Sequence, residues 1–363
     1  MNGIAIVILI FSLLGCVDYL LGNKIGVGRE FERAFSLFCP MALSMLGMIV
    51  IAPAIGVLLE PFFSLFYRLL GLDPSIIPAS LFANDMGGAP LTQSIAKTEE
   101  IGGYNAFVIS SMMGCMVSFN IPFSLGIVNK DRHKELFFGF LCGIVTIPVG
   151  GLVAGLICKI PFGALLLNLL PLLVLDALLC VALIYFERDC IRGFAIFGSG
   201  MKVLGIVGLA LAVFTFLTKV QISPHLDTFA NAAQVCANAC VTLSGALPLM
   251  YLATRLLDKP LRLLGDRIGI NGTATLAFLG TLVTNASTFG VMEKMDRRGA
   301  VLNAAFAVSA SFVFGSHLAF TMAYDASYLF PMIVGKLVAG ACAVVLAAFL
   351  YKEKPLAAEV NEG

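Results

Sequence analysis

The chain has 363 residues, of which 59% are hydrophobic and only 12% are charged, and its mean hydropathy is +0.97. Soluble globular domains carry about twice this share of charged residues. The composition therefore excludes an ordinary soluble protein and predicts an all-α, polytopic membrane protein that lies in a lipid bilayer. The net charge of +1 gives no reason to expect nucleic acid as a partner.

Nine apolar stretches are long enough, or nearly so, to cross a hydrocarbon core about 30 Å thick. The first lacks a basic leading segment and a small-residue cleavage motif, so it is interpreted as a span and not as a removable signal peptide. The predicted spans are 3–21, 36–58, 104–127, 136–158, 163–185, 203–218, 229–253, 300–323 and 328–350. Two further segments, 76–97 and 272–294, have the length to cross but contain many polar residues.

The segment 76–97 contains the stretch SLFANDMGGAPLTQS. A full crossing would bury Asn84, Asp85 and Gln93 at bilayer depth, and one aspartate alone costs about 2.5–3.5 kcal/mol at a helix centre. Backbone that leaves the helix at this depth needs protein or water to satisfy it. We therefore predict half-helices over 77–84 and through Gln93, separated by a structural break. The residues that favour the break are Gly87, Gly88 and Pro90.

The distribution of Lys and Arg between the loops tests the number of spans. If both doubtful segments cross, the loop Lys and Arg divide 11 against 11, and no orientation is indicated. If both enter and leave on one side, the division becomes 18 against 4, which agrees with the positive-inside rule. We therefore predict nine spans and two re-entrant segments, with the N-terminus outside and the C-terminus inside.

The two halves of the sequence resemble each other. Pro53 corresponds to Pro248, 195 residues later, and Pro61 corresponds to Pro260, 199 residues later. With nine spans, the two broken segments enter from opposite sides, so the repeat is predicted to be inverted, as in many transporters. Chance similarity between apolar helices is the alternative.

We predict a single transmembrane transporter domain over residues 1–350. The expected parts are repeat one at about 36–158, connecting helices at 163–218, repeat two at about 229–350, and a short cytoplasmic tail at 351–363.

The polar residues of the broken segments predict a binding site near the middle of the membrane. Asp85 follows a half-helix, and both its carboxylate and the negative end of that half-helix attract cations. The residues expected beside Asp85 are Asn84, Gln93, Asn120, Thr284, Asn285 and His317, with Phe119 and Phe320 as faces for an ammonium ion. Each has an alternative: Asp85 could cap a helix or pair with Lys336, the amides and His317 could join helices, and the phenylalanines could pack.

Other polar and metal-binding residues give weaker signals. Lys336 lies inside the last span and could pair with Asp85 or Asp176, or reject metal cations as a fixed positive charge. Asp176 lies outside the repeats, so a structural ion pair is its expected role. The 10 cysteines and 3 histidines form no ligand spacing that predicts a metal site.

Several motifs resemble those of the ethanolamine utilisation protein EutH family. They include NDMGG (84–88), SMMG (111–114), FNIPFSLGI (119–127), GIVTIPVG (143–150), MDRRGAVLNAAFAVSASFVFGSHLAF (295–320) and FPMIVGKLVAG (330–340). The resemblance covers about residues 3–350. It implies entry of ethanolamine, a protonated amino alcohol, through the bacterial inner (plasma) membrane. One departure from the family pattern is Ser316, where an acid often precedes the histidine, and this places more weight on Asp85.

Three functions are therefore distinguished. The first is a permease or channel for ethanolamine that has no bound cofactor. The second is a secondary transporter of another small polar solute, coupled to protons or sodium through Asp85 or Asp176. The third, a membrane enzyme, is disfavoured because the sequence has neither an HExxH motif nor paired carboxylates at helical spacing. The sequence leaves the oligomeric state open, and a homo-oligomer is one expectation.

Overall fold

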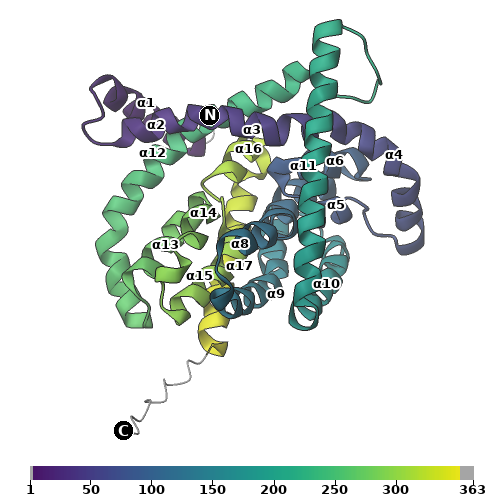
Figure 1. Cartoon of the computed structure of the whole chain (residues 1–363). Coiled ribbons are helices and arrows are strands. Elements are labelled where there is room, and N and C mark those ends of the chain that lie inside the picture. The colour runs from purple at the N-terminus through teal and green to yellow at the C-terminus, as the bar shows by residue number, and fades with distance from the viewer. Residues whose placement is uncertain (1–2, 352–363) are drawn as a thin grey trace.

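The apolar stretches fold into helices, and the computed structural model describes residues 3–351 of the chain. Every regular element in this range is helical, which confirms the all-α class (Figure 1). The predicted tail at 351–363 lies outside the described residues, apart from Tyr351.

The first half contains the following elements, in which η marks 3₁₀- or π-helical turns: α1 (Gly3–Leu20), α2 (Val27–Ser36), α3 (Phe38–Met41), η1 (Ala42–Leu46), α4 (Gly47–Leu70), α5 (Ile76–Leu81), η2 (Asn84–Met86), α6 (Gly88–Ile95), α7 (Glu99–Tyr104), η3 (Asn105–Gly114), η4 (Met116–Asn120), α8 (Ile121–Ile127), η5 (Lys130–Arg132) and α9 (His133–Ile157). Two long helices then connect the halves: α10 (Phe162–Tyr185) and α11 (Glu187–Thr218).

The second half repeats the order of the first from α4 onward, since a long helix with two prolines precedes a broken segment and further helices. Its elements are α12 (Phe229–Ile268), α13 (Gly272–Val283), α14 (Asn285–Phe289), η6 (Met292–Lys294), α15 (Arg297–Ala310), α16 (Ser316–Tyr324), η7 (Ala326–Tyr328) and α17 (Leu329–Leu350). Pro53 and Pro61 lie in α4, and Pro248 and Pro260 lie in α12.

Eight helical segments in the described range are long and apolar enough to cross a membrane, and they cover eight of the nine predicted spans. The remaining predicted span, 300–323, is interrupted between α15 and α16. Phe312 adopts a left-handed conformation there, with φ of +60°. The amides of Phe312 and Phe314 donate to the carbonyls of Thr281 and Leu282 at 3.1 and 2.8 Å, so the interruption is held by the neighbouring broken segment.

Both broken segments are hairpins whose two ends are joined. In the first hairpin, the amides of Lys97 and Thr98 donate to Oδ2 of Asp73 at 3.1 and 3.3 Å. In the second, the amide of Asn271 donates to Oδ1 of Asp296 at 2.7 Å. Each chain segment therefore enters and leaves at the same place, as the re-entrant prediction requires.

The two hairpins open at opposite ends of α17. Gly103, just after the first hairpin, lies so close to Tyr328 that a Cβ there would stand 2.2 Å from the phenol oxygen. Arg298, just after the second hairpin, donates to the carbonyls of Ala348 and Tyr351 at the other end of α17. An inverted repeat requires this arrangement, and the repeat itself stays a prediction.

Close backbone contacts at glycines pack the helices. A Cβ at Gly139 of α9 would stand 2.5 Å from the Val301 carbonyl oxygen of α15, and one at Gly150 would stand 2.3 Å from that of Gly335 in α17. Small residues are typical of helix contacts within membranes because they let the backbones approach. Helix α11 packs on α4 and extends beyond the other helices at one end (Figure 1).

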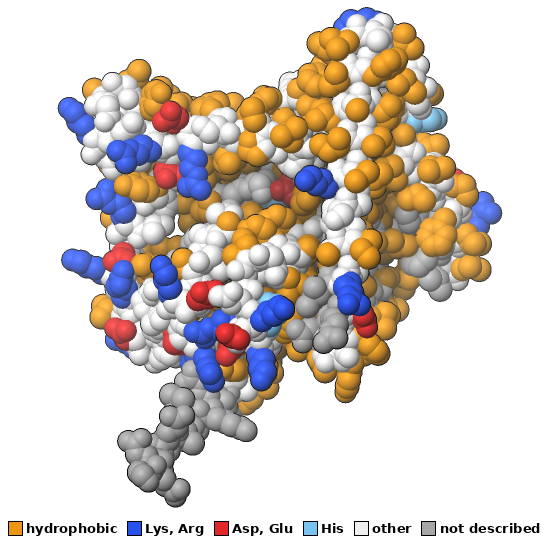
Figure 2. Space-filling view, viewed as in Figure 1, with side chains coloured by type: hydrophobic (Ala, Val, Ile, Leu, Met, Phe, Trp, Pro, Cys, Tyr) orange, Lys and Arg blue, Asp and Glu red, His pale blue; other side chains and the backbone are white. Residues whose placement is uncertain are grey.

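The outer surface combines apolar and basic regions. Large apolar side chains are exposed along α10 and α11, as expected for helices that face lipid. Figure 2 shows hydrophobic side chains over the upper and right parts of this face, whereas most Lys and Arg lie along its left and lower margins. The structure thus fits a multi-pass membrane protein.

Candidate functional site

The tip of the first hairpin holds Asp85 in a turn between α5 and α6. Gly87 there has φ of +87°, a left-handed conformation that favours glycine. A Cβ at Gly88 would stand 2.3 Å from the Phe82 carbonyl oxygen, so the turn leaves no room for a side chain. Pro90 lies in the first turn of α6, where its missing N–H costs no helical hydrogen bond.

Hydroxyl groups of the π-helical segment behind the hairpin fix this tip. The hydroxyl of Ser110 donates to the Phe82 carbonyl at 2.5 Å. The amide of Ala83 donates to the Ser118 hydroxyl at 3.0 Å. A π-helix within a longer helix is often found at a functional site, and here it anchors the backbone that carries Asp85.

Asn120 and Asn285 join the π-helical segment behind the first hairpin to the second hairpin. The Asn285 side-chain amide donates to the Asn120 carbonyl oxygen at 2.5 Å, and the Asn120 amide donates to the Ala307 carbonyl at 3.1 Å. Both side chains are fully buried. These contacts support the structural alternative for the pair, in which the amides connect helices.

Asp85, His317 and Lys336 lie in a row. Nε2 of His317 is 3.7 Å from Oδ1 of Asp85, and Nζ of Lys336 is 3.1 Å from Nδ1 of the same imidazole. The Lys336 ammonium also donates to the Ser111 carbonyl at 2.5 Å. The predicted direct pair of Asp85 with Lys336 is therefore replaced by an arrangement in which His317 stands between the two charges. The Asp85 side chain is 14% exposed, and that of His317 is 1% exposed.

A cavity of about 340 Å³ brings together Asp85, Phe119 and His317 of the predicted residues. Another wall comes from α3, η1 and the residue before α3, and it is apolar apart from Ser44: Leu37, Pro40, Met41 and Met45. Figure 2 shows this face of the molecule hollowed between α3 and α8. The cavity thus combines one carboxylate with apolar and aromatic walls, and such a mostly apolar lining with few polar groups is typical of small-molecule sites.

Phe312 and Ser316 also line the cavity, and the sequence did not indicate Phe312. The rings of Phe119 and Phe312 meet edge to face at 5.4 Å, and Phe312 lies 5.1 Å from the His317 ring. Because Phe312 has a left-handed backbone, it is strained for a residue with a side chain, and such strain is concentrated at functional sites. The sequence has a phenylalanine and not a glycine at position 312, so it gave no sign of the left-handed backbone there.

Other predicted residues lie elsewhere. Asn84 is buried, and its amide donates to the Thr321 hydroxyl at 3.4 Å. Thr284 lines a separate cavity of about 180 Å³ beside α2 and α12. Gln93 lies near the far end of α6, whereas the first hairpin contributes Ala83, Asp85 and Met86 to the 340 Å³ cavity. Phe320 is buried one helical turn beyond His317.

Asp176 is buried in α10, and its two carboxylate oxygens have no hydrogen-bond partner among the described residues. The ion pair predicted for Asp176 is therefore not found within residues 3–351. Cys180 lies one helical turn further along α10.

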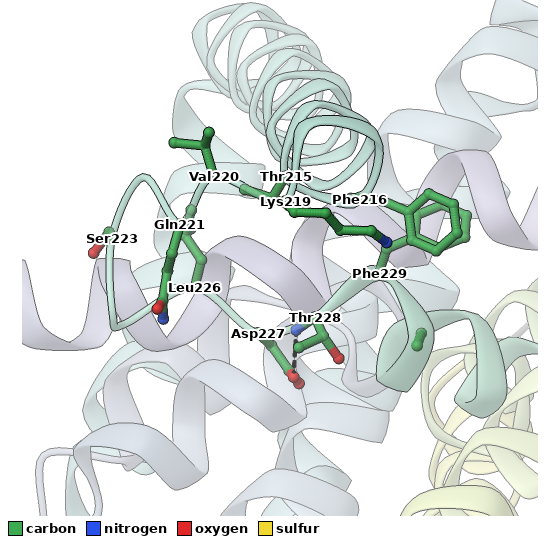
Figure 3. Close-up of a pocket in the computed structure, with 11 residues that line it drawn as sticks. Thr215, Phe216, Lys219, Val220, Gln221, Ser223, Leu226, Asp227, Thr228 and Phe229 are labelled. Carbon is green, nitrogen blue, oxygen red and sulfur yellow. Dashed lines mark hydrogen bonds between the residues drawn. The ribbon is translucent and has the colours of Figure 1, made fainter.

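A larger cavity, of about 460 Å³, is formed by residues 215–230, which connect α11 and α12. Figure 3 shows the Lys219 ammonium beside the Phe216 ring, 4.5 Å from its centroid. Since the residues that line this cavity all come from one connection, it is separate from the site around Asp85. Among the described residues, no three His, Cys, Asp or Glu side chains are grouped as metal ligands.

Comparisons with known proteins agree with the motifs and the fold. The family model "Ethanolamine utilisation protein, EutH" matches residues 1–350. A "Probable ethanolamine permease EutH" of Listeria monocytogenes is 37% identical over 341 residues, which are 94% of this chain and 91% of the relative.

Two further relatives are similar over nearly their whole lengths. A "Probable ethanolamine permease EutH" of Salmonella typhimurium is 34% identical, and the match covers 95% of this chain and 94% of the relative. The "Uncharacterized protein YxeR" of Bacillus subtilis is 33% identical, and the match covers 96% of this chain and 94% of the relative. No solved structure matches the chain. The chain belongs to the EutH family of ethanolamine utilisation proteins.

Proposed function

We propose that this protein is a permease that admits ethanolamine, as its ammonium ion, through the bacterial plasma membrane. The observation that carries the proposal is the Asp85 carboxylate in a 340 Å³ cavity between the tip of the first hairpin and the break that separates α15 from α16. Relatives of the chain are named probable ethanolamine permeases, which supports ethanolamine as the solute. The protein moves its substrate and changes no covalent bond in it.

The walls of the cavity suit the two ends of the substrate. Asp85 offers a negative charge to the ammonium group, and the rings of Phe119 and Phe312 offer cation–π attraction beside it. Ser316 offers a hydroxyl that can donate to or accept from the hydroxyl of the substrate. Because position 316 is a serine here and not an acid, Asp85 supplies the carboxylate among the residues that line the cavity.

The buried Lys336 determines which nitrogen of the His317 imidazole carries the proton. An ammonium group only donates hydrogen bonds, so Nδ1 of His317 must accept, and the imidazole proton then lies on Nε2, toward Asp85. The imidazole thus separates Asp85 from the lysine, and the carboxylate stays available to a cation in the cavity.

We further propose that passage is facilitated and downhill, with the N-terminus outside and the C-terminus inside. The orientation is supported by the Lys and Arg that surround the end of the second hairpin, including Lys294, Arg297 and Arg298. An inverted repeat is supported by the hairpins that open at opposite ends of α17.

Uptake into proteoliposomes without any ion gradient tests the function. We expect labelled ethanolamine to enter until its concentrations inside and outside are equal, and unlabelled ethanolamine to compete better than ethylene glycol, which has no charge. Liposomes that contain no protein correct for diffusion of the neutral amine. Equal entry into both kinds of liposome would contradict a permease function.

A coupled transporter is the second candidate, and Asp176 favours it. A buried carboxylate without a hydrogen-bond partner is costly unless it binds a proton or a cation. This candidate predicts that uptake requires a proton or sodium gradient and that Asp176→Asn abolishes accumulation. Entry at full rate without gradients excludes it.

A further inference from the structure

Four aromatic rings form a continuous column that begins one helical turn beyond His317. The centroids of Phe320 and Tyr324 are 5.4 Å apart, those of Tyr324 and Phe107 are 5.8 Å apart, and those of Phe107 and Tyr328 are 5.4 Å apart. Phe107 and Phe320 are fully buried, whereas Tyr324 is 36% exposed. The column therefore runs from Phe320, near the site, through the exposed Tyr324 and the buried Phe107 to Tyr328.

Acidic residues lie near the two tyrosines of this column. Asp227 follows Leu226, which packs on the same apolar cluster as Ala323, the residue before Tyr324. Three further acids lie by Tyr328: Asp325 precedes it by one helical turn, and Glu99 and Glu100 begin α7, whose Gly103 packs against the Tyr328 phenol. These four residues come from three separate parts of the chain, and the nine-span topology places all of them on the outer side.

The acidic residues and the aromatic rings both favour the same class of ligand, an organic cation. A group of acidic side chains raises the local concentration of cations, and the faces of aromatic rings attract ammonium groups. The opposite end of α17 instead lies beside basic residues, such as Arg297 and Arg298. The aromatic column and the acids thus distinguish one end of the bundle as suited to organic cations.

We propose that Tyr324 and Tyr328, with the four acids around them, form an outer recognition site for small organic ammonium ions. The identity of the ion as ethanolamine rests on the proposed function, whereas the outer site itself rests on the rings and the acids. Packing alone is the alternative, because stacked rings also stabilise helix contacts.

A fluorescence titration tests the outer site directly. The chain contains no tryptophan, so the Tyr324→Trp variant carries one reporter at this place. We expect its emission to change saturably with ethanolamine, in purified protein at a pH where the amine is protonated, and not with ethylene glycol. Phe349→Trp is the matched control, since Phe349 is 78% exposed at the far end of α17 and should not respond.

The same titration in an Asp85→Asn background separates this inference from the proposed function. We expect the change in emission to persist there even though uptake is lost. A response that disappears with Asp85, or one that ethylene glycol produces equally, overturns the outer site while leaving the permease function intact. A saturable response in a protein without ethanolamine uptake would retain the outer site and contradict the permease function.

Transport kinetics provide a second test that does not need the tryptophan. Tyr324→Leu removes the ring and should raise the half-saturating ethanolamine concentration about fivefold, with the maximal rate retained. Tyr324→Phe keeps the ring and should behave as the natural chain does. Equal effects of the two variants, or a loss of maximal rate alone, would contradict the outer site.

Discussion

The ammonium of Lys336 lies 3.1 Å from Nδ1 of His317, so a buried positive charge contacts the imidazole that faces Asp85. The lysine is fully buried in α17, and its other partner is the Ser111 carbonyl. A charge in this position is tolerated only when it is hydrogen-bonded. The arrangement links α17 and the π-helical segment to the site and holds His317 in one tautomer.

Lys336→Met should destabilise the protein. The substitution leaves the Ser111 carbonyl and His317 without their donor, and a hydrogen bond to a charged group is worth about 1.5–3 kcal/mol. Thermal unfolding in detergent measures the loss, with Lys202→Met on the exposed surface of α11 as the control. An unchanged unfolding temperature for Lys336→Met would show that the contacts of this lysine contribute no stability.

Asn120 and Asn285 should behave as one unit. Each single change to alanine leaves a buried amide without a partner and should cost about 1–3 kcal/mol. The double variant should cost less than the sum of the two, by about 0.5–3 kcal/mol, because both single changes break the same contact. A double-mutant cycle of unfolding free energies measures this, and strict additivity would mean that the contact is absent.

Gly88→Ala should disrupt the first hairpin. Its Cβ would stand 2.3 Å from the carbonyl oxygen of Phe82 and 2.5 Å from that of Ala83, and backbone atoms cannot easily move away. We expect uptake to fall at least tenfold while the chain still inserts into the membrane. Gly126→Ala is the matched control, since a Cβ there meets nothing within 4 Å. Similar uptake by both variants would show that the tip of the hairpin tolerates rearrangement.

The re-entrant topology predicts a pattern of labelling in intact cells. Single cysteines introduced at Arg68 and Glu99, before and after the first hairpin, should both react with an impermeant reagent from outside. A cysteine at Lys294 should react only after the membrane is permeabilised. The variants are made after the exposed native Cys39 is replaced. Reaction at only one side of the first hairpin would restore the eleven-span topology.

The sequence predicted those parts of the fold that depend on the free-energy cost of placing particular residues within the bilayer. Asp85, Gly87 and Gly88 cannot continue an apolar helix across a bilayer, and the distribution of Lys and Arg then favoured a re-entrant hairpin over a crossing. The interruption at Phe312 was missed, because its geometry depends on hydrogen bonds from the second hairpin, which lies about thirty residues earlier in the sequence. Local propensity contains no information about such a contact.

The candidate site was predicted less completely than the fold. Asp85, Phe119 and His317 do line one cavity, but Thr284 and Gln93 lie elsewhere. The direction of a side chain in a short half-helix depends on the residue at which that helix begins, and the sequence fixes this boundary only to within a few residues.

Uptake of ethanolamine by the Asp85→Asn variant tests the central claim most directly. The assay uses proteoliposomes at a pH where the amine is protonated, with Asp258→Asn, an exposed acid of α12, as the control for charge removal. We predict that Asp85→Asn inserts normally and loses uptake, while Asp258→Asn transports at the natural rate. Uptake by Asp85→Asn at the natural rate would contradict a cation site at this carboxylate.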